Sequence, residues 1–123
     1  MGLFDRIPRL ALVPALAVLI FLVDIPWLYT VSGWSSDMIR DIQGSTLQMK
    51  VLPAIVVYLA LGYLATLPKS LLEAFGIGAA TYAVYDFTNL ATLKAYDPMF
   101  AIADTLWGGT LMAAVYWIRT TVL

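Results

Sequence analysis

The sequence contains no cysteine and no histidine among its 123 residues. Structural zinc sites, haem held by two imidazoles and the histidine clusters of membrane di-iron enzymes all need those side chains as ligands. The sequence therefore excludes these centres, and we expect no cofactor. A bound metal would have to be a hard cation held by oxygen atoms. There is also no disulfide and no thiol nucleophile.

Charge is the second thing that the sequence has little of. Only 12% of the residues are charged and 62% are hydrophobic, whereas a soluble globular chain carries roughly 25% charged residues. The 7 basic residues stand against 8 acidic ones, so there is no basic patch of the kind that binds nucleic acid. The length allows one domain, residues 1–123, and its expected partner is the lipid bilayer.

Four apolar stretches are each near the roughly 20 residues that cross the hydrocarbon of a membrane. Lipid cannot satisfy a backbone N–H or C=O group, and only a helix closes those bonds within one segment. The sequence thus predicts an all-α fold, a polytopic membrane protein with four transmembrane helices in an up-down-up-down bundle. The predicted spans are about 8–31, 51–67, 71–93 and 98–122, and a polar connection is expected over 32–50.

An even number of spans places both termini on the same side of the membrane. Lysine and arginine number four on that side and three on the other, so the positive-inside rule favours cytoplasmic termini by one residue. Both orientations stay open. The four on the terminal side are Arg6, Arg9, Lys69 and Arg119, and the three on the other are Arg40, Lys50 and Lys94.

Three carboxylates lie inside the predicted spans: Asp24, Asp86 and Asp104. Each is six or seven residues from a span end that faces the same side, so a rise of about 1.5 Å per residue places all three in one layer roughly 10 Å deep. Tyr58, seven residues into the second span, falls in the same layer. The sequence predicts an acidic layer near the membrane face that carries the long connection.

Each aspartate has a polar or aromatic neighbour three residues on, where side chains share a helix face. The pairs are Asp24 with Trp27, Asp86 with Asn89, and Asp104 with Trp107, so the D-x-x-W pattern occurs twice. Tyr82 precedes Asp86 by one turn and extends a polar stripe along the third span. These eight residues form the candidate binding site, and we expect no catalytic residue among them.

Two interpretations of this layer stay open. Ionised aspartates are costly at membrane depth, so either some are protonated or a cation shares the site. Alternatively, indole, phenol and amide groups bond the carboxylates and fix the register of the helices as a structural clamp.

The run Tyr85-Asp86-Phe87-Thr88-Asn89-Leu90-Ala91-Thr92 resembles the signature of the small four-helix membrane proteins catalogued as domain of unknown function 2177. Asp104-Thr-Leu-Trp107-Gly and Asp24-Ile-Pro-Trp27 extend the likeness over nearly the whole chain. The family usually shows a Gly-Trp-Pro-like turn after the third helix, where this sequence has Ala95-Tyr-Asp-Pro98. The resemblance implies the helix count and the choice of motif residues, and it implies no activity.

Three functions are compatible with these features. The first is the binding or transport of a proton, a cation or a cationic small solute at the acidic layer, in which case a homodimer is expected because four helices enclose little space. The second is an accessory or structural subunit of a larger membrane assembly. The third is a membrane-embedded lipid-modifying enzyme, which ranks lowest because the sequence has no recognisable nucleophile motif and no phosphate-binding glycine loop.

Overall fold

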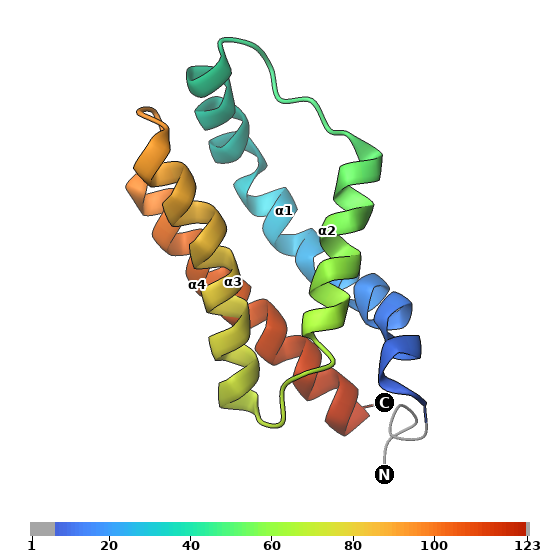
Figure 1. The fold of residues 1–123 in the computed structure, drawn as a ribbon. Coiled ribbons are helices and arrows are strands. Elements are labelled where there is room, and N and C mark those ends of the chain that lie inside the picture. Colours follow the sequence, from blue (N-terminus) through green and yellow to red (C-terminus); the bar gives the residue numbers. More distant parts are fainter. Residues whose placement is uncertain (1–6, 123) are drawn as a thin grey trace.

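The computed structural model describes residues 7–122, and over that range the chain is all-α with four long helices (Figure 1). The helices are close to the predicted spans except at the first. Their bounds are α1 Val13–Gln43, α2 Val51–Leu64, α3 Leu71–Thr92 and α4 Pro98–Trp117, with a 3₁₀ turn η2 over Arg9–Leu12 and a π-helical turn η3 over Ile118–Val122. Arg6, which enters the orientation count, lies outside the described residues.

Helix α1 is longer than the sequence suggested, because it continues from Ser32 to Gln43 through residues expected to form a polar connection. The reason is an apolar face. Val31 and Met38 are buried with Tyr96 and Phe100 in one apolar cluster, and this packing favours helix over loop. The helix ends at Gly44, whose φ of 76° is the left-handed conformation typical of a helix C-terminus. The true connection is 44–50.

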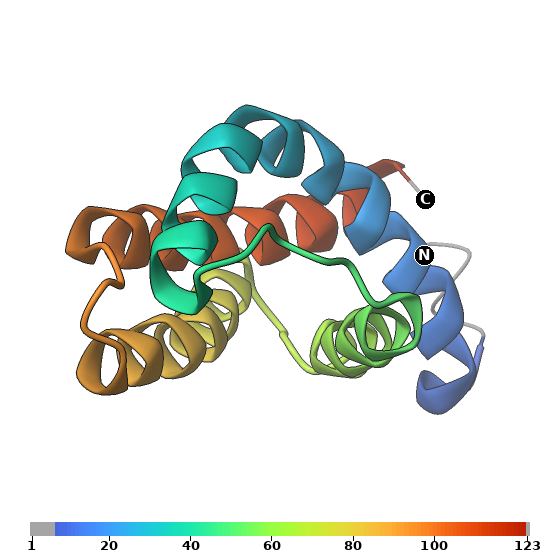
Figure 2. The ribbon, with the colours of Figure 1, turned by 90° about the horizontal axis from the view of Figure 1, so that it is seen from above.

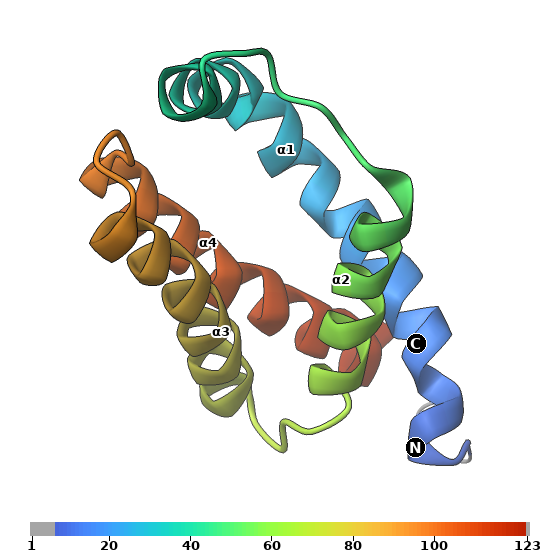
Figure 3. The same cartoon turned by 45° about the horizontal axis from the view of Figure 1, so that its top comes forward.

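The four helices associate as two pairs. Helix α2 packs on α1 and α3 packs on α4, while α1 also contacts α4. Seen from above, α1 curves across the bundle, with Pro26 inside it, and the connection to α2 passes over the space between the pairs (Figure 2). Helices α2 and α3 diverge on either side of that space (Figure 3). The first described residues and the end of α4 lie at the same end of the molecule (Figure 1).

Two helix starts are fixed by side chains that accept backbone N–H bonds. The Ser70 hydroxyl accepts from the N–H of Glu73 at 3.1 Å, and the Asp97 carboxylate accepts from the N–H of Met99 at 2.9 Å. Such caps satisfy donors that would otherwise lack a partner in the first turn. Pro98 follows Asp97 at the first helical position, where a missing N–H costs nothing. These caps set where α3 and α4 begin and hence the level of Asp86 and Asp104.

Two apolar clusters lie along the bundle, and the acidic residues lie between them. The lower cluster is the larger and forms where the first half of α1 packs against the ends of α2 and α4. The upper one joins α1 to the start of α4. The lower cluster consists of Leu12, Leu16, Ile20, Leu61, Ala65, Leu111, Met112 and Val115, and the upper one of Val31, Met38, Tyr96, Phe100 and Ala101.

The outer surface of the bundle is apolar while its interior contains carboxylates. Large hydrophobic side chains are exposed along all four helices, and Asp24, Asp86 and Asp104 are buried. This is the reverse of a soluble protein and fits a lipid environment. Within the described residues two helices are long and apolar enough to cross a membrane, Arg9–Gln43 and Pro98–Val122, and Val51–Leu64 is apolar but shorter.

Close packing of α3 on α4 depends on Gly78. A Cβ atom there would collide with the carbonyl oxygen of Gly108 and lie 2.6 Å from the Cγ atom of Met112. We therefore expect Gly78→Ala to lower the free energy of unfolding by about 1–3 kcal/mol, as overpacking does. The measurement is thermal unfolding of the purified protein in detergent.

Gly76 provides the matched control, because a Cβ atom there meets nothing within 4 Å on the same helix. Gly76→Ala should leave stability unchanged or raise it by up to about 1 kcal/mol through helix propensity. Equal effects of the two substitutions would contradict the close approach of α3 and α4.

Candidate functional site

Asp24 of α1 is the most completely bonded of the three carboxylates. Its Oδ2 atom accepts from the Tyr58 hydroxyl of α2 at 2.6 Å, and its Oδ1 atom accepts from the Trp107 indole of α4 at 2.7 Å. The side chain is 4% exposed. One carboxylate thus joins three helices, and charge-assisted bonds of this kind are stronger than bonds between neutral groups.

Asp104 of α4 is bonded in the reciprocal way. Its Oδ1 atom accepts from the Trp27 indole of α1 at 3.1 Å, so each tryptophan donates to the aspartate of the other helix. The two indole rings stack at 5.4 Å with an angle of 11° between their planes. Each tryptophan shares a helix face with the aspartate three residues before it, but its indole N–H donates to the aspartate of the other helix. Helices α1 and α4 are antiparallel, and so each D-x-x-W motif meets the other.

Asp86 of α3 is fully buried, and its partner was not foreseen. Its Oδ1 atom accepts from the Tyr96 hydroxyl at 2.6 Å. Tyr96 lies in the connection between α3 and α4 and folds back over the helix end. Burial, together with the bond to Asp86, raises the pKa of the Tyr96 hydroxyl above its ordinary range. Asn89, which the sequence pairs with Asp86 on one helix face, lies near the hydroxyls of Tyr96 and Tyr85.

Asp86 lies one turn beyond Tyr82, whose ring meets Gly108, and Asp104 lies one turn before Gly108, so the two carboxyl groups lie near each other across the α3–α4 interface. The Oδ2 atom of Asp86 is buried and has no hydrogen-bond partner among the described residues. The three aspartates therefore form one layer: Asp24 is joined to Asp104 through the stacked indoles, and Asp104 lies beside Asp86. We refer to these three residues as the acidic layer.

The donors to the acidic layer are two indoles and two phenols, all of them neutral groups. Nothing in this set balances the negative charge that an ionised carboxylate brings. Within residues 7–122 there is no group of three or more acidic side chains close enough to hold a metal ion. A hard cation bound by all three carboxylates together is therefore not supported by the geometry.

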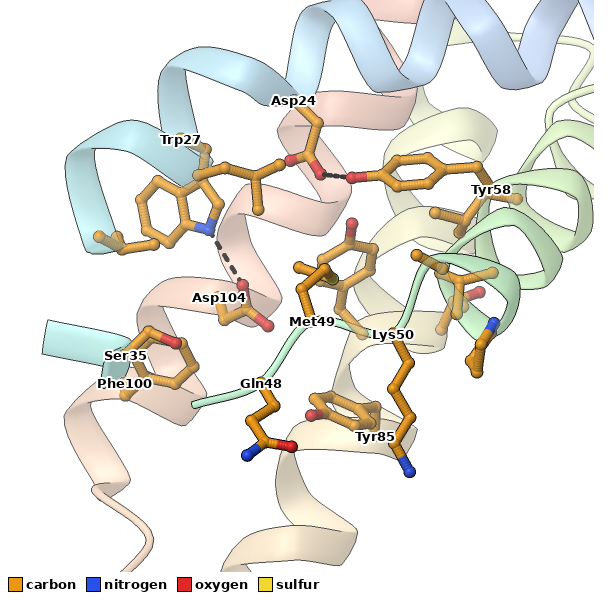
Figure 4. A pocket seen from close by; sticks show the side chains of 18 residues that line it. Asp24, Trp27, Ser35, Gln48, Met49, Lys50, Tyr58, Tyr85, Phe100 and Asp104 are labelled. Carbon is orange, nitrogen blue, oxygen red and sulfur yellow. Dashed lines mark hydrogen bonds between the residues drawn. The ribbon is translucent and has the colours of Figure 1, made fainter. Parts of the chain in front are cut away.

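A cavity of about 680 Å³ lies beside the acidic layer, between α1–α2 and α3–α4. Asp24 and Asp104 line it, and Asp86 does not. In Figure 4, Tyr58 and Trp27 point toward these two carboxylates, whereas the Lys50 ammonium group points away from them. The other walls are mainly apolar and aromatic: Leu28, Val31, Met49, Pro53, Val57, Leu61, Tyr82, Tyr85 and Phe100.

The structure thus brings together all eight residues that the sequence singled out, in unequal roles. Six take part in the hydrogen bonds of the layer. Tyr82 lines the cavity and packs its ring against Gly108, and Asn89 lies near Tyr85 and Tyr96. Tyr96, which bonds Asp86, and Tyr85, which lines the cavity, were not predicted as site residues. The only signal for Tyr96 was an aromatic residue in a short connection.

An all-α chain with carboxylates inside and apolar side chains outside is a helical membrane protein. Residues 9–121 match the family described as predicted membrane protein (DUF2177), and the chain belongs to that family. The resemblance inferred from the Tyr85–Thr92 run is confirmed. Comparison with curated proteins and comparison with solved structures give no match.

The exchange of partners between α1 and α4 can be tested by double-mutant cycles. Trp27→Phe combined with Asp104→Asn should show a coupling of about 0.5–3 kcal/mol in the free energy of unfolding, as contacting residues do. The measurement is reversible unfolding in bicelles.

The control cycle combines Trp27→Phe with Asp24→Asn, the neighbour in the same helix, and its coupling should be the smaller of the two. Trp107→Phe should show the mirror pattern, with stronger coupling to Asp24→Asn. Stronger coupling within each helix would refute the exchange.

Proposed function

We propose that this protein is a multi-pass membrane protein that binds a hydrophobic organic cation in the cavity beside its acidic layer. The observation that carries the proposal is the cavity itself: about 680 Å³, with carboxylates on one side and apolar or aromatic side chains on the others. Ligand pockets of this size are typical of small-molecule sites, which combine apolar walls with a few placed polar groups.

The charge of the ligand follows from the acidic layer. Asp24 and Asp104 are 4% and 8% exposed, and their donors are neutral groups. An ionised aspartate at membrane depth costs about 2.5–3.5 kcal/mol on insertion scales. A ligand cation in the cavity offsets part of that cost by direct attraction.

The aromatic walls favour an organic cation over a metal ion. Trp27, Tyr58, Tyr82, Tyr85 and Phe100 all line the cavity. The faces of such rings attract organic cations, by about 0.5–2 kcal/mol per contact depending on solvation. A metal ion would instead need several oxygen ligands at short range.

The ligand reaches the cavity from the bilayer. The two sides of the cavity are formed by α2 and α3, which pack on α1 and α4 respectively and diverge from each other. The connection 44–50 passes over the cavity on the polar side, and Gln48, Met49 and Lys50 line it there (Figure 4). Lateral access suits a ligand that partitions into lipid.

The membrane arrangement that supports this function has all four helices crossing the bilayer in up-down-up-down order as one domain. Both termini then lie on one side, and the balance of lysine and arginine favours the cytoplasmic side by one residue. Helix α2 has 14 residues, or about 21 Å at the helical rise, so it spans only with its flanking residues or where the bilayer is thinner. Movement of the ligand across the membrane would require a second copy of the chain, because four helices enclose little space.

A structural role as an accessory subunit is the second candidate. The observation that favours it is that both oxygens of Asp24 are already bonded by side chains of α2 and α4. Such a clamp needs no ligand. This role predicts stable association with a larger membrane protein and no cation binding.

Two adjacent valines of α2 test the proposal. Val57 lines the cavity and Val56 does not, yet their exposed fractions are similar at 53% and 59%. We expect Val57→Trp to weaken binding of tetraphenylphosphonium at least tenfold by filling the cavity, and Val56→Trp to change it less than twofold. The measurement is equilibrium binding of labelled tetraphenylphosphonium to the protein in nanodiscs, with empty nanodiscs subtracted.

Tetraphenylborate, an anion of nearly the same shape, controls for apolar binding. It should bind more weakly than tetraphenylphosphonium, and Asp104→Asn should reduce this difference. Equal affinity for the two ions would contradict a site selected for positive charge.

A further inference from the structure

Asp86 has one feature that the cavity does not explain. It is fully buried, it does not line the cavity, and its Oδ2 atom has no hydrogen-bond partner among the described residues, although the carboxyl group of Asp104 lies nearby across the α3–α4 interface. A buried oxygen atom without a donor costs about 1–3 kcal/mol, and more where the group is charged. A proton on one of the two carboxyl groups would supply the missing donor.

A single proton satisfies this geometry. Two ionised carboxylates repel each other and have no hydrogen to share, whereas one carboxylic acid donates to one carboxylate in a short and strong bond. The Oδ1 atoms of the pair are already bonded, because Tyr96 donates to Asp86 at 2.6 Å and Trp27 donates to Asp104 at 3.1 Å. The Oδ2 atom of Asp86 is left without a partner beside the carboxyl group of Asp104.

We propose that Asp86 and Asp104 form a proton-binding site that holds one shared proton, and that a cation entering the cavity displaces it. The displacement of the proton by the cation rests on the proposed function. Asp104 belongs to both the pair and the cavity, whereas Asp86 belongs only to the pair. A cation beside Asp104 favours the doubly ionised pair, and so the proton leaves as the cation binds.

The balance of the exchange is one for one. The O–H bond of the shared acid breaks, the proton goes to solvent, and the positive charge of the ligand takes its place beside Asp104. The structure thereby assigns the layer a coupling between proton and cation. The other titratable groups around the pair come from every neighbouring element. They are Asp24 on α1, Lys50 just before α2, Tyr58 on α2, Tyr82 and Tyr85 on α3, and Tyr96 in the α3–α4 connection.

The displacement of a proton determines how the affinity for the cation changes with pH. Protons compete with the cation, so the affinity for tetraphenylphosphonium should rise with pH over the range in which the pair releases its proton. One displaced proton corresponds to about a tenfold change in Kd per pH unit. Tetraphenylborate binding should not strengthen as the pH rises.

Asp86→Asn removes the proton-binding site but keeps the size and shape of the side chain. The amide N–H of asparagine donates to the Asp104 carboxylate, and its carbonyl oxygen accepts from Tyr96, so both bonds survive without a shared proton. We expect this variant to fold and to show less than a twofold change in Kd for tetraphenylphosphonium per pH unit.

The decisive experiment has two readouts on the full-length protein in nanodiscs. Infrared spectroscopy of the ligand-free protein at neutral pH should show the C=O stretching band of a protonated carboxylic acid, and Asp86→Asn should abolish it. Adding tetraphenylphosphonium to the wild type should remove the same band and release one proton per site into weakly buffered solution.

The outcomes separate the two proposals. If the wild type has no acid band at neutral pH, the shared proton is refuted whether or not the cation binds. If the band is present but tetraphenylphosphonium does not bind, the shared proton stands and both the proposed function and the displacement step fail. If the cation binds with unchanged pH dependence in Asp86→Asn, the pair is not the site of exchange.

Discussion

The reciprocal bonding of two aspartates and two tryptophans between α1 and α4 is the interaction on which the rest of the structure depends. Trp27 donates to Asp104 and Trp107 donates to Asp24, while the two indoles stack between them. A slip of one helix by a single turn would break both bonds at once and leave the Oδ1 atoms of both carboxylates without donors in an apolar interior. The arrangement thus fixes the register of antiparallel helices where apolar packing alone would tolerate sliding.

This register sets the rest of the acidic layer. With α1 and α4 locked, Asp24 reaches Tyr58 on α2 and Asp104 faces Asp86 on α3, so four helices meet at one level between two apolar clusters. The exposed side of each helix is left apolar for lipid. The acidic layer can therefore be a structural clamp and a binding site at the same time. The bonds that fix the register of the helices place Asp104 between the cavity on one side and Asp86 on the other.

Helical periodicity and membrane depth were enough to predict four helices and a common level for Asp24, Asp86, Asp104 and Tyr58, because both depend only on counting residues along each helix. Counting residues along each helix could not predict which side chains of different helices bond with each other. The D-x-x-W spacing places each indole on the same helix face as an aspartate, and only the antiparallel contact of α1 with α4 determines that each indole bonds the aspartate of the other helix. The extension of α1 to Gln43 and the bond from Tyr96 to Asp86 were missed for the same reason, since each is fixed by contacts with distant residues.

The most direct test of this account is the indole N–H spectrum of the protein labelled with ¹⁵N-tryptophan in nanodiscs, since the chain has only four tryptophans. The signals of Trp27 and Trp107 should exchange slowly with solvent. Asp104→Asn should shift chiefly the Trp27 signal, and Asp24→Asn chiefly the Trp107 signal. Larger shifts within the same helix, or rapid exchange of both signals with water, would contradict a buried acidic layer held by partner exchange between α1 and α4.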